Sequence, residues 1–322
     1  MGFSLGRIAF LALVLFAGAS AAQDFPARPL KMIVPFAAGG TTDALGRALA
    51  QALGERLGQA VVVENRSGGG GTIGTEAGAR STPDGYNLLL GSVESFGMTN
   101  ADAKRLNYNP EKDLVAIAMV SRAPNAIVVH PSVKASTMRE LVELARAMPG
   151  KIRYGSPGIG TNGHIIMEVF AQRNGISLVH VPYKGGGAGI TDLLSGQIES
   201  SITGVVTSAP HVRAGKLRAL ATTGAARPSV MSDVPTMAEA GFNDFVLGPL
   251  FGVFVPAGTP PAIVTRLTSE VLAAKQNAEF RKRVAEIGQE LTEDLSGADF
   301  GRFMVAEARR WREMAATAGL KD

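Results

Sequence analysis

Short apolar, β-branched segments alternate with helical patterns along this chain, and this alternation restricts the fold more than any other feature. Nine of these segments are often bounded by Gly or Pro and read as buried strands. The predicted strands are residues 32–36, 60–64, 87–91, 126–130, 152–155, 178–183, 198–203, 217–222 and 251–255. Patterns such as the capping box of Thr137 and Glu140 indicate helices between them. The alternation is typical of α/β proteins with largely parallel sheets.

Domain boundaries are not marked by a break in composition. Two polar, proline-containing stretches, Ser121–Asn125 and Thr223–Pro235, are the best candidates. They predict an inserted α/β lobe of residues 125–224 and an outer α/β lobe made of residues 23–124 plus 225–322. Two crossings of this kind form a hinge, with a ligand held between the lobes.

The N-terminus has the pattern of a secretory signal peptide, predicted over residues 1–22. Arg7 precedes the apolar run Ile8–Ala17, and Ala19-Ser20-Ala21 has the small-x-small pattern of a processing site. A membrane anchor is the alternative, but the run is shorter than the ~20 residues that span a bilayer. We therefore expect an exported, soluble protein located in the periplasm.

Composition excludes several kinds of chemistry. The chain has no cysteine, which rules out disulfides, thiol catalysis and thiolate metal sites. Its 4 histidines show no metal-ligand spacing, so neither a metal nor a cofactor is expected. The net charge of +4 comes from scattered basic residues, whose densest groups lie in helical patterns. Such groups are typical of solvated helix faces, and no nucleic-acid partner is expected.

Glycines gather where predicted strands run into predicted helices. The four junctions contain Gly39–Gly40, Gly68–Gly71, Gly158–Gly163 and Gly185–Gly187. The start of a helix carries backbone N–H groups without intrahelical partners and the positive end of the helix dipole. In open α/β sheets, ligands lie outside the carboxyl ends of the strands. Together the junctions predict one anion-binding cleft, although each glycine alone also suits a tight turn.

These junctions also allow two hypotheses of enzymatic function. Gly158-x-Gly160-x-x-Gly163 matches the dinucleotide fingerprint, but the acidic residue that should follow about 20 positions later is missing. An exported hydrolase would depend on Ser156 near His164, without a Gly-x-Ser-x-Gly elbow. Asp43 has two readings as well, because it can cap the helix or meet an ammonium group on a ligand.

Several long motifs resemble one family over essentially the whole chain after the signal. They are VPFAAGGTTD, VVENRSGGGGTIG, YGSPGIGTNGHI, VPYKGGGAGITDLLSGQIE, GKLRALATTGAARPSVMSDVPTMAEAGF and VPAGTPPAIVTRL. This pattern resembles the Bug (Bordetella uptake gene) family, the solute receptors of tripartite tricarboxylate transporters. The resemblance implies a two-lobed periplasmic binding protein of type II, a "Venus flytrap" with a hinge. It also implies a small carboxylate ligand and no catalysis.

The resemblance also implies the positions that contact the ligand. They are Phe36, Ala37, Ala38, Gly39, Gly40, Thr41, Thr42, Asp43, Ser92, Glu94, Ser156, Gly158, Gly160, Thr161, His164, Tyr183, Lys184, Gly185, Gly186, Gly187, Thr203 and Gly204. The expected protein is a monomer that delivers its ligand to an integral-membrane transporter. A membrane-bound sensor as the partner, and an exported hydrolase, are the alternatives.

Three departures from the family pattern concern the ligand and the core. The chain has Leu250-Phe251-Gly252 where many relatives carry Trp-x-Gly, and its single tryptophan is Trp311. The predicted strand at 198–203 begins with the polar residues Glu199, Ser200 and Ser201. Glu94 places a carboxylate near the cleft, which disfavours a second negative group on the ligand unless a cation offsets it.

Overall fold

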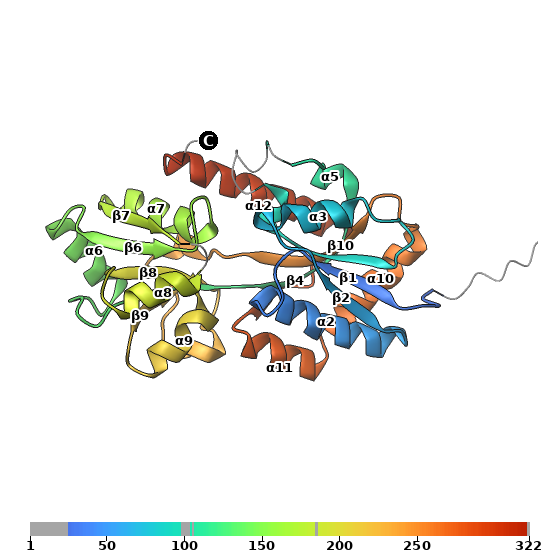
Figure 1. Cartoon of the computed structure of the whole chain (residues 1–322), viewed down its shortest axis with the longest axis horizontal. Coiled ribbons are helices and arrows are strands. Elements are labelled where there is room, and N and C mark those ends of the chain that lie inside the picture. The colour runs from blue at the N-terminus through green and yellow to red at the C-terminus, as the bar shows by residue number, and fades with distance from the viewer. Residues whose placement is uncertain (1–24, 98–103, 105, 184–185, 321–322) are drawn as a thin grey trace, which may run out of the picture.

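Two β-sheets with helices packed on them make up the two lobes of the molecule (Figure 1). The computed structural model describes residues 25–97, 104, 106–183 and 186–320. The predicted signal peptide, residues 1–22, lies outside the described residues. Where the chain is described, none of its helices is both long enough and apolar enough to cross a membrane.

The first sheet has six strands and the second has five, in the orders β11-β4-β10-β3-β1-β2 and β7-β6-β8-β5-β9. The first contains β1 (Leu30–Val34), β2 (Val61–Asn65), β3 (Asn87–Ser92), β4 (Leu114–Arg122), β10 (Leu250–Pro256) and β11 (Glu290–Leu291). The second contains β5 (Asn125–Val129), β6 (Ile152–Ser156), β7 (Leu178–Pro182), β8 (Ser200–Gly204) and β9 (Arg218–Thr222).

Helices connect most of these strands and pack against the sheets (Figure 1). With the first sheet lie α2 (Thr41–Leu57), α3 (Thr72–Ala79), α5 (Pro110–Asp113), α10 (Pro261–Ala274), α11 (Ala278–Glu286) and α12 (Gly297–Thr317). With the second lie α6 (Met138–Ala147), α7 (Asn162–Asn174), α8 (Gly186–Leu194) and α9 (Val205–Arg213). The predicted capping box is confirmed, because the Glu140 amide donates to Thr137 Oγ1 over 3.1 Å at the start of α6.

Each of the nine predicted strands is present, with its ends within two residues of the predicted ones. Two strands were not predicted from the sequence: β4, the nine-residue run LVAIAMVSR, and the two-residue β11. The continuous apolar run of β4 is the signal that identifies a central strand, since both of its faces are covered. β11 carries no such signal, because it exists only through its pairing with the end of β4.

The expectation of largely parallel sheets was wrong. β1 pairs in parallel with β2 and β3, but β10 runs antiparallel to both β3 and β4. In the second sheet β5 is antiparallel to both β8 and β9. The reason is the crossing of the chain between the sheets. β5 and β10 are the first strands after a crossing, so they run away from the hinge while their neighbours run toward it.

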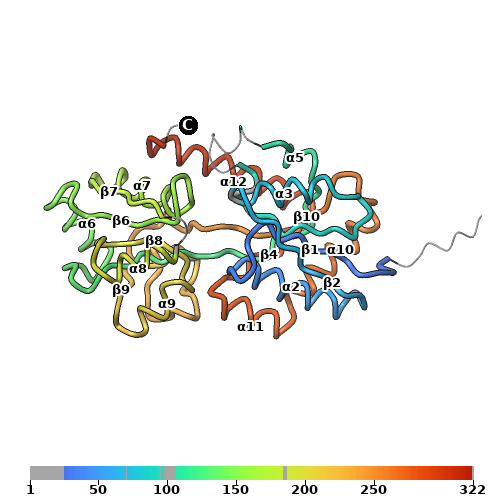
Figure 2. Tube along the Cα trace, viewed as in Figure 1, coloured from blue at the N-terminus to red at the C-terminus, as the bar shows by residue number. Residues whose placement is uncertain are grey.

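The chain passes from the first sheet to the second between Arg122 and Asn125, and returns between Thr222 and Leu250. The predicted domain limits at 124/125 and 224/225 fall in these two stretches. As limits of separate folding units they stay a prediction. Helix α12 makes a third link, because it contacts β4 on one side and α7 on the other (Figures 1 and 2).

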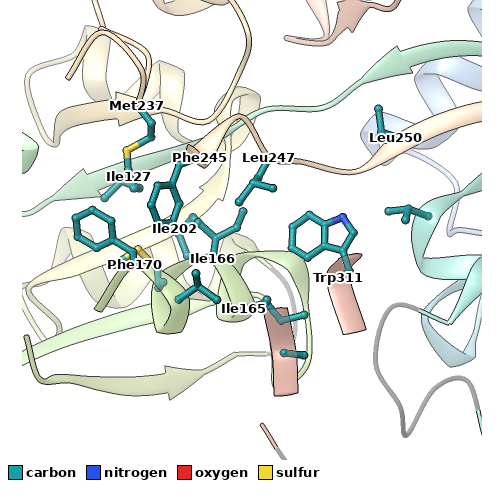
Figure 3. Close-up of a cluster of buried hydrophobic side chains, with 14 of the residues drawn as sticks. Ile127, Ile165, Ile166, Phe170, Ile202, Met237, Phe245, Leu247, Leu250 and Trp311 are labelled. Atoms are coloured by element: carbon teal, nitrogen blue, oxygen red, sulfur yellow. The ribbon is translucent and has the colours of Figure 1, made fainter. Parts of the chain in front are cut away.

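One hydrophobic cluster joins the two lobes. It includes Ile33 of β1, Ile127 of β5 and Trp311 of α12. The indole of Trp311 is 0% exposed and lies between the side chains of α7, such as Ile165, and Leu247 on the returning segment (Figure 3). The only tryptophan of the chain therefore sits at the junction of the lobes.

The polar start of β8 is satisfied by its neighbour β6. Glu199 pairs with Arg153 over 2.6 Å, and the hydroxyls of Ser200 and Ser201 donate to the carbonyl oxygens of Arg153 and Gly155. Because every one of these polar groups has a partner, the strand lies inside the sheet without a desolvation cost for an unpaired group.

Candidate functional site

The carboxyl ends of strands from both sheets meet at the chain crossing. The register shows this, since Gly204 at the end of β8 pairs with Asn125 at the start of β5. A cavity of about 170 Å³ lies there. It is lined by Thr41, Ala123, Pro124, Pro157, Thr203, Gly204, Val205, Val206, Thr207, Ile287, Gly288 and Gln289. These residues come from both lobes and from the crossing itself, so the cavity is an interlobe cleft.

The helices α2 and α9 begin at this cleft without a side-chain cap, and the uncapped start of α7 lies near the crossing, where Asn162 Oδ1 accepts a hydrogen bond from Asn125 Nδ2 over 2.8 Å. The N-cap residues of α2, α7 and α9 are Gly40, Thr161 and Gly204, and none of them bonds a first-turn amide through its side chain. By contrast, the N-caps Thr137 and Asn277 of α6 and α11 do accept such bonds. Uncapped first turns leave N–H groups and the positive dipole ends available to an anion. In α9 the amide of Val205 already donates to the carbonyl oxygen of Pro124 over 3.3 Å, so the amides that follow it are the available ones.

The first junction is open to solvent. Residues 37–41 are exposed, Phe36 is half-buried and Thr42 is buried. Gly39 has φ +83°, a conformation that favours glycine, whereas Gly40 has φ −82°, which any residue adopts. The glycine at position 39 therefore shapes the turn, and the one at 40 keeps the helix start unobstructed.

The carboxylate of Asp43 organises this junction from inside. Its Oδ2 accepts hydrogen bonds from the amide of Gly39 (2.9 Å) and from Arg47 Nε (3.0 Å), and its Oδ1 accepts one from Asn65 Nδ2 (2.9 Å). Burial opposes ionisation, but these hydrogen bonds outweigh it, so the pKa of Asp43 lies below its usual value. With only 4% exposure, the carboxylate is engaged within the protein. This geometry favours the structural reading of Asp43 over contact with a ligand ammonium.

The glycines of the second junction serve packing. A Cβ added at Gly74 would lie 2.6 Å from the Cα of Pro35, and one at Gly71 would lie 3.2 Å from the ring of Phe36. Helix α3 therefore approaches the first junction closely only because these positions lack side chains. The close contacts at Gly71 and Gly74 support the first junction through Phe36 and Pro35.

The loop between β6 and α7 uses two of its own amides to hold its shape. The amide of Gly158 donates to Ser156 Oγ (3.2 Å), and that of Gly160 donates to Nδ1 of His164 (3.1 Å). Thr161 Oγ1 donates to the carbonyl oxygen of Gly158 over 2.7 Å. Pro157 is the residue of this loop that lines the cavity, while the imidazole of His164 is 5% exposed behind the loop.

Tyr183 lies under α8. Its hydroxyl donates to Asp192 Oδ2 over 2.7 Å, and its ring is 3.1 Å from where a Cβ of Gly189 would stand. Burial, together with the bond to the Asp192 carboxylate, raises the pKa of Tyr183 to about 12. The tyrosine thus holds the middle and the second half of α8 through Gly189 and Asp192.

The remaining predicted positions divide into four groups. Thr203 and Gly204 line the cavity, while Ser92 ends β3 with no exposed surface. Gly186 and Gly187 open α8. Lys184 and Gly185 lie outside the described residues, and so does the side chain of Glu94, whose backbone is in the turn Val93–Phe96.

Sequence reasoning missed several residues of the cleft. Ile287, Gly288 and Gln289 reach it from a segment near the end of the chain, where no glycine-rich junction marks them. Gln289 is 6% exposed, and its Oε1 accepts a hydrogen bond from Ser121 Oγ over 2.6 Å. Ala123 and Pro124 lie in the crossing between the sheets, and the polar stretch there predicted only a domain boundary.

The structure gives little support to catalysis at the cleft. Ser156 is 2% exposed, and its hydroxyl shares a hydrogen bond with His180 Nε2 (2.7 Å), not with His164. Within the described residues, no three His, Asp or Glu side chains are grouped so as to hold a metal ion.

A larger hollow of about 650 Å³ lies elsewhere, between α12 and β4, and apolar residues such as Leu114 and Phe254 line much of it. It contains the first two residues of α12, Gly297 and Ala298, but no residue of α2, α7 or α9.

Comparison with known proteins shows the family to which the sequence is similar. The sequence pattern described as "Tripartite tricarboxylate transporter family receptor" matches residues 45–320. Protein BugT of Bordetella pertussis (strain Tohama I) is 37% identical over 314 residues, which cover 97% of this chain and 96% of BugT.

Two solved structures share the fold. The R. palustris protein Rpa4515, solved with adipate, superposes with a TM-score of 0.76 at 34% identity, covering 92% of this chain and 99% of that one. MatC from Rhodopseudomonas palustris, solved with bound malate, has a TM-score of 0.73 at 28% identity, covering 90% and 99%. The two-lobed α/β fold predicted from the sequence is confirmed. The chain therefore belongs to the tripartite tricarboxylate transporter receptor family, the solute-binding receptors that include BugT.

Proposed function

We propose that this protein is a periplasmic receptor that captures a small carboxylate in the interlobe cleft and delivers it to a tripartite tricarboxylate-type transporter. The observation that carries the proposal is the meeting of two uncapped helix starts, that of α2 in one lobe and that of α9 in the other, at one cavity. Adipate and malate, bound in the two similar structures, are both dicarboxylates. Small dicarboxylates are therefore the first ligand class to test.

Binding and closure are one process in this mechanism. A carboxylate seated on the start of α2 presents its remaining lone pairs to amides and hydroxyls of the other lobe, such as those at Thr203 and Thr207. Each charge-assisted hydrogen bond contributes about 1.5–3 kcal/mol. Those made only when the lobes approach shift the equilibrium toward the closed state.

The proposed contact set follows from where the structure places the predicted residues. Thr41, Thr203 and Gly204 line the cavity directly, and the amides of Thr41 and Thr42 belong to the first turn of α2. We assign Asp43 and His164 to the support of the cleft because both are buried and bonded to glycine amides.

The activity that we propose is closure of the lobes around a ligand, without chemical turnover. The predicted signal peptide supports the periplasmic location.

A thermal-shift screen tests the proposal. The protein lacking residues 1–22 is heated with a panel of dicarboxylates and monocarboxylates, each paired with its amide as a control. A ligand that binds only the native state adds about 2.7 kcal/mol at a hundredfold excess over its Kd. Stabilisation by an acid and none by its amide is expected. If no acid stabilises the protein even after it is denatured, freed of co-purified ligand and refolded, the proposal is wrong.

A pair of variants at one position locates the site. Gly40→Leu fits the backbone, since φ is −82° and an added Cβ meets only the Ala37 carbonyl oxygen at 3.6 Å. Its bulk covers the start of α2, so binding should fall at least about a hundredfold with the melting temperature retained. Gly40→Ala, with its single methyl group, is the matched control and should bind much more tightly than Gly40→Leu. Equal affinities of the two variants would place the ligand elsewhere.

A further inference from the structure

Four titratable side chains form a cluster behind the β6–α7 loop, outside the proposed ligand contacts. They are Tyr154, His164, Glu168 and His180. The rings of His164 and His180 stack with centroids 3.7 Å apart and an interplanar angle of 15°. The ring of Tyr154 also stacks with that of His180, with centroids 5.0 Å apart, and its hydroxyl donates to Glu168 Oε1. The four side chains come from β6, β7 and α7.

Ring nitrogens of the two histidines bond both ends of the loop. Nδ1 of His164 accepts the amide hydrogen of Gly160 over 3.1 Å. Nε2 of His180 shares a hydrogen bond with Ser156 Oγ over 2.7 Å, and the same Oγ contacts the amide and carbonyl of Gly158. Gly158 and Gly160 both have positive φ, +150° and +74°, so the loop depends on these bonds to select one shape.

The geometry requires a neutral His164. Because Gly160 donates to Nδ1, that nitrogen must carry a lone pair, and the ring hydrogen is on Nε2, which lies 3.9 Å from Glu168 Oε1. A protonated ring would turn a hydrogen toward the Gly160 amide. Two charged imidazoles at stacking distance would also repel each other.

The surroundings favour the neutral pair. Burial lowers the pKa of His164 to about 4, and burial together with the neighbouring His164 lowers that of His180 to about 4. The carboxylate of Glu168 opposes this decrease in the pKa of His180. The hydroxyl of Tyr154 already bonds that carboxylate.

We propose that His164 and His180 are positioning residues that hold the Ser156–Thr161 loop in its ligand-binding shape, and that protonating them releases it. The inference rests on the proposed carboxylate site, because Pro157 of this loop lines the cavity and the loop leads into α7 at Thr161. The imidazoles act through the loop and do not touch the ligand.

The first test needs no ligand. In ¹⁵N-labelled protein at pH 7, His164 should show the tautomer with hydrogen on Nε2. The amide resonances of Gly158 and Gly160 should move together with the titration of the two histidines as the pH falls toward about 4. Glycine amides that stay unchanged while both histidines titrate would overturn the inference. Because the ligand is absent, this result does not depend on the proposed function.

The second test separates the ring nitrogen from the ring. His164→Phe keeps the stack and loses the acceptor, whereas His164→Asn places an acceptor near the position of Nδ1 and cannot titrate. With adipate as the probe, we expect about a tenfold weaker Kd for His164→Phe at pH 7 and recovery of most of that loss by His164→Asn. Lowering the pH to about 4.5 should weaken the wild type more than His164→Asn. Titration of the ligand itself cancels in this ratio.

Control variants complete the design. His130→Asn changes a histidine at the far end of β5, which bonds Ser132, and should leave Kd unchanged. His180→Gln keeps a polar group near Ser156 and serves if His164→Phe does not fold. Equal pH dependence of the wild type and His164→Asn would overturn the inference even if adipate binds. If adipate does not bind the wild type, a dicarboxylate that stabilised the protein in the thermal screen replaces it.

Discussion

The amide of Gly39 donates a hydrogen bond of 2.9 Å to the carboxylate of Asp43, so the first turn of α2 fixes the loop that precedes it. The same carboxylate holds Asn65 at the end of β2, whose Nδ2 also donates to the carbonyl oxygen of Phe36 over 3.0 Å. A residue of the helix and one of the neighbouring strand thus set the shape of the proposed anion site before any ligand arrives.

Replacing Asp43 with alanine should weaken both stability and binding. Loss of a buried carboxylate that accepts three hydrogen bonds should cost about 2 kcal/mol of unfolding free energy. Carboxylate affinity should fall about tenfold or more, because the Gly39 loop is no longer held. Urea unfolding and calorimetry measure the two effects. Glu55→Ala, on an exposed part of the same helix, is the control and should change neither. Unchanged affinity in Asp43→Ala would show that the loop needs no such support.

The stability that Asp43 contributes should depend on pH in one direction. Its folded pKa is depressed, so the contribution is complete above the unfolded pKa near 3.8 and disappears as the pH falls through the lower folded value. The difference in unfolding free energy between the wild type and Asp43→Ala should therefore be constant from pH 7 to 5 and shrink in acid. Urea unfolding of both proteins over this range measures it. A difference that grows in acid would contradict the assigned bonds.

Trp311 should report ligand binding by fluorescence. The indole is fully buried at the contact of α12 with α7, and its Nε1 has no hydrogen-bond partner among the described residues. Its emission should be blue-shifted, and closure of the lobes should change its intensity by altering the packing of Ile165 and Leu247 around it. The intensity should saturate with the Kd found by calorimetry. The Trp311→Phe variant, which contains no tryptophan, is the control for fluorescence that comes from other groups. Binding seen by calorimetry without a change in emission would show that this contact does not move.

Gly252 should tolerate no side chain. A Cβ there would overlap the ring of the buried Phe300 and lie 2.8 Å from the carbonyl oxygen of Ala118. Gly252→Ala should therefore destabilise the protein by about 1–3 kcal/mol. In a double-mutant cycle with Phe300→Leu, the combined loss should be smaller than the sum of the single losses, as measured by urea unfolding. Strict additivity would mean that the Ala118 backbone, and not the ring, sets the cost.

Local patterns identified most of the elements. Strands such as Asn87–Ser92 and helices such as Met138–Ala147 were predicted because apolar periodicity and caps are written within a few residues. The junction at Gly40 was found in the same way, because the end of a strand and the start of a helix are adjacent in the chain, whereas Gly204 was predicted only from the resemblance to the family. The family followed from motifs spread over the whole sequence.

By itself, then, the sequence determined the α/β class, the glycine-rich helix starts and the family of solute receptors. Only the tertiary structure decided which groups surround the cleft. It placed Asn65 beside Asp43, His180 against His164, and the segment of Gln289 in a cavity with residues such as Thr41 and Thr203 that lie far away in the chain. It also reversed β5 and β10, because each begins at a crossing between the lobes. These contacts depend on how distant segments pack together, and no short pattern of residues encodes such packing.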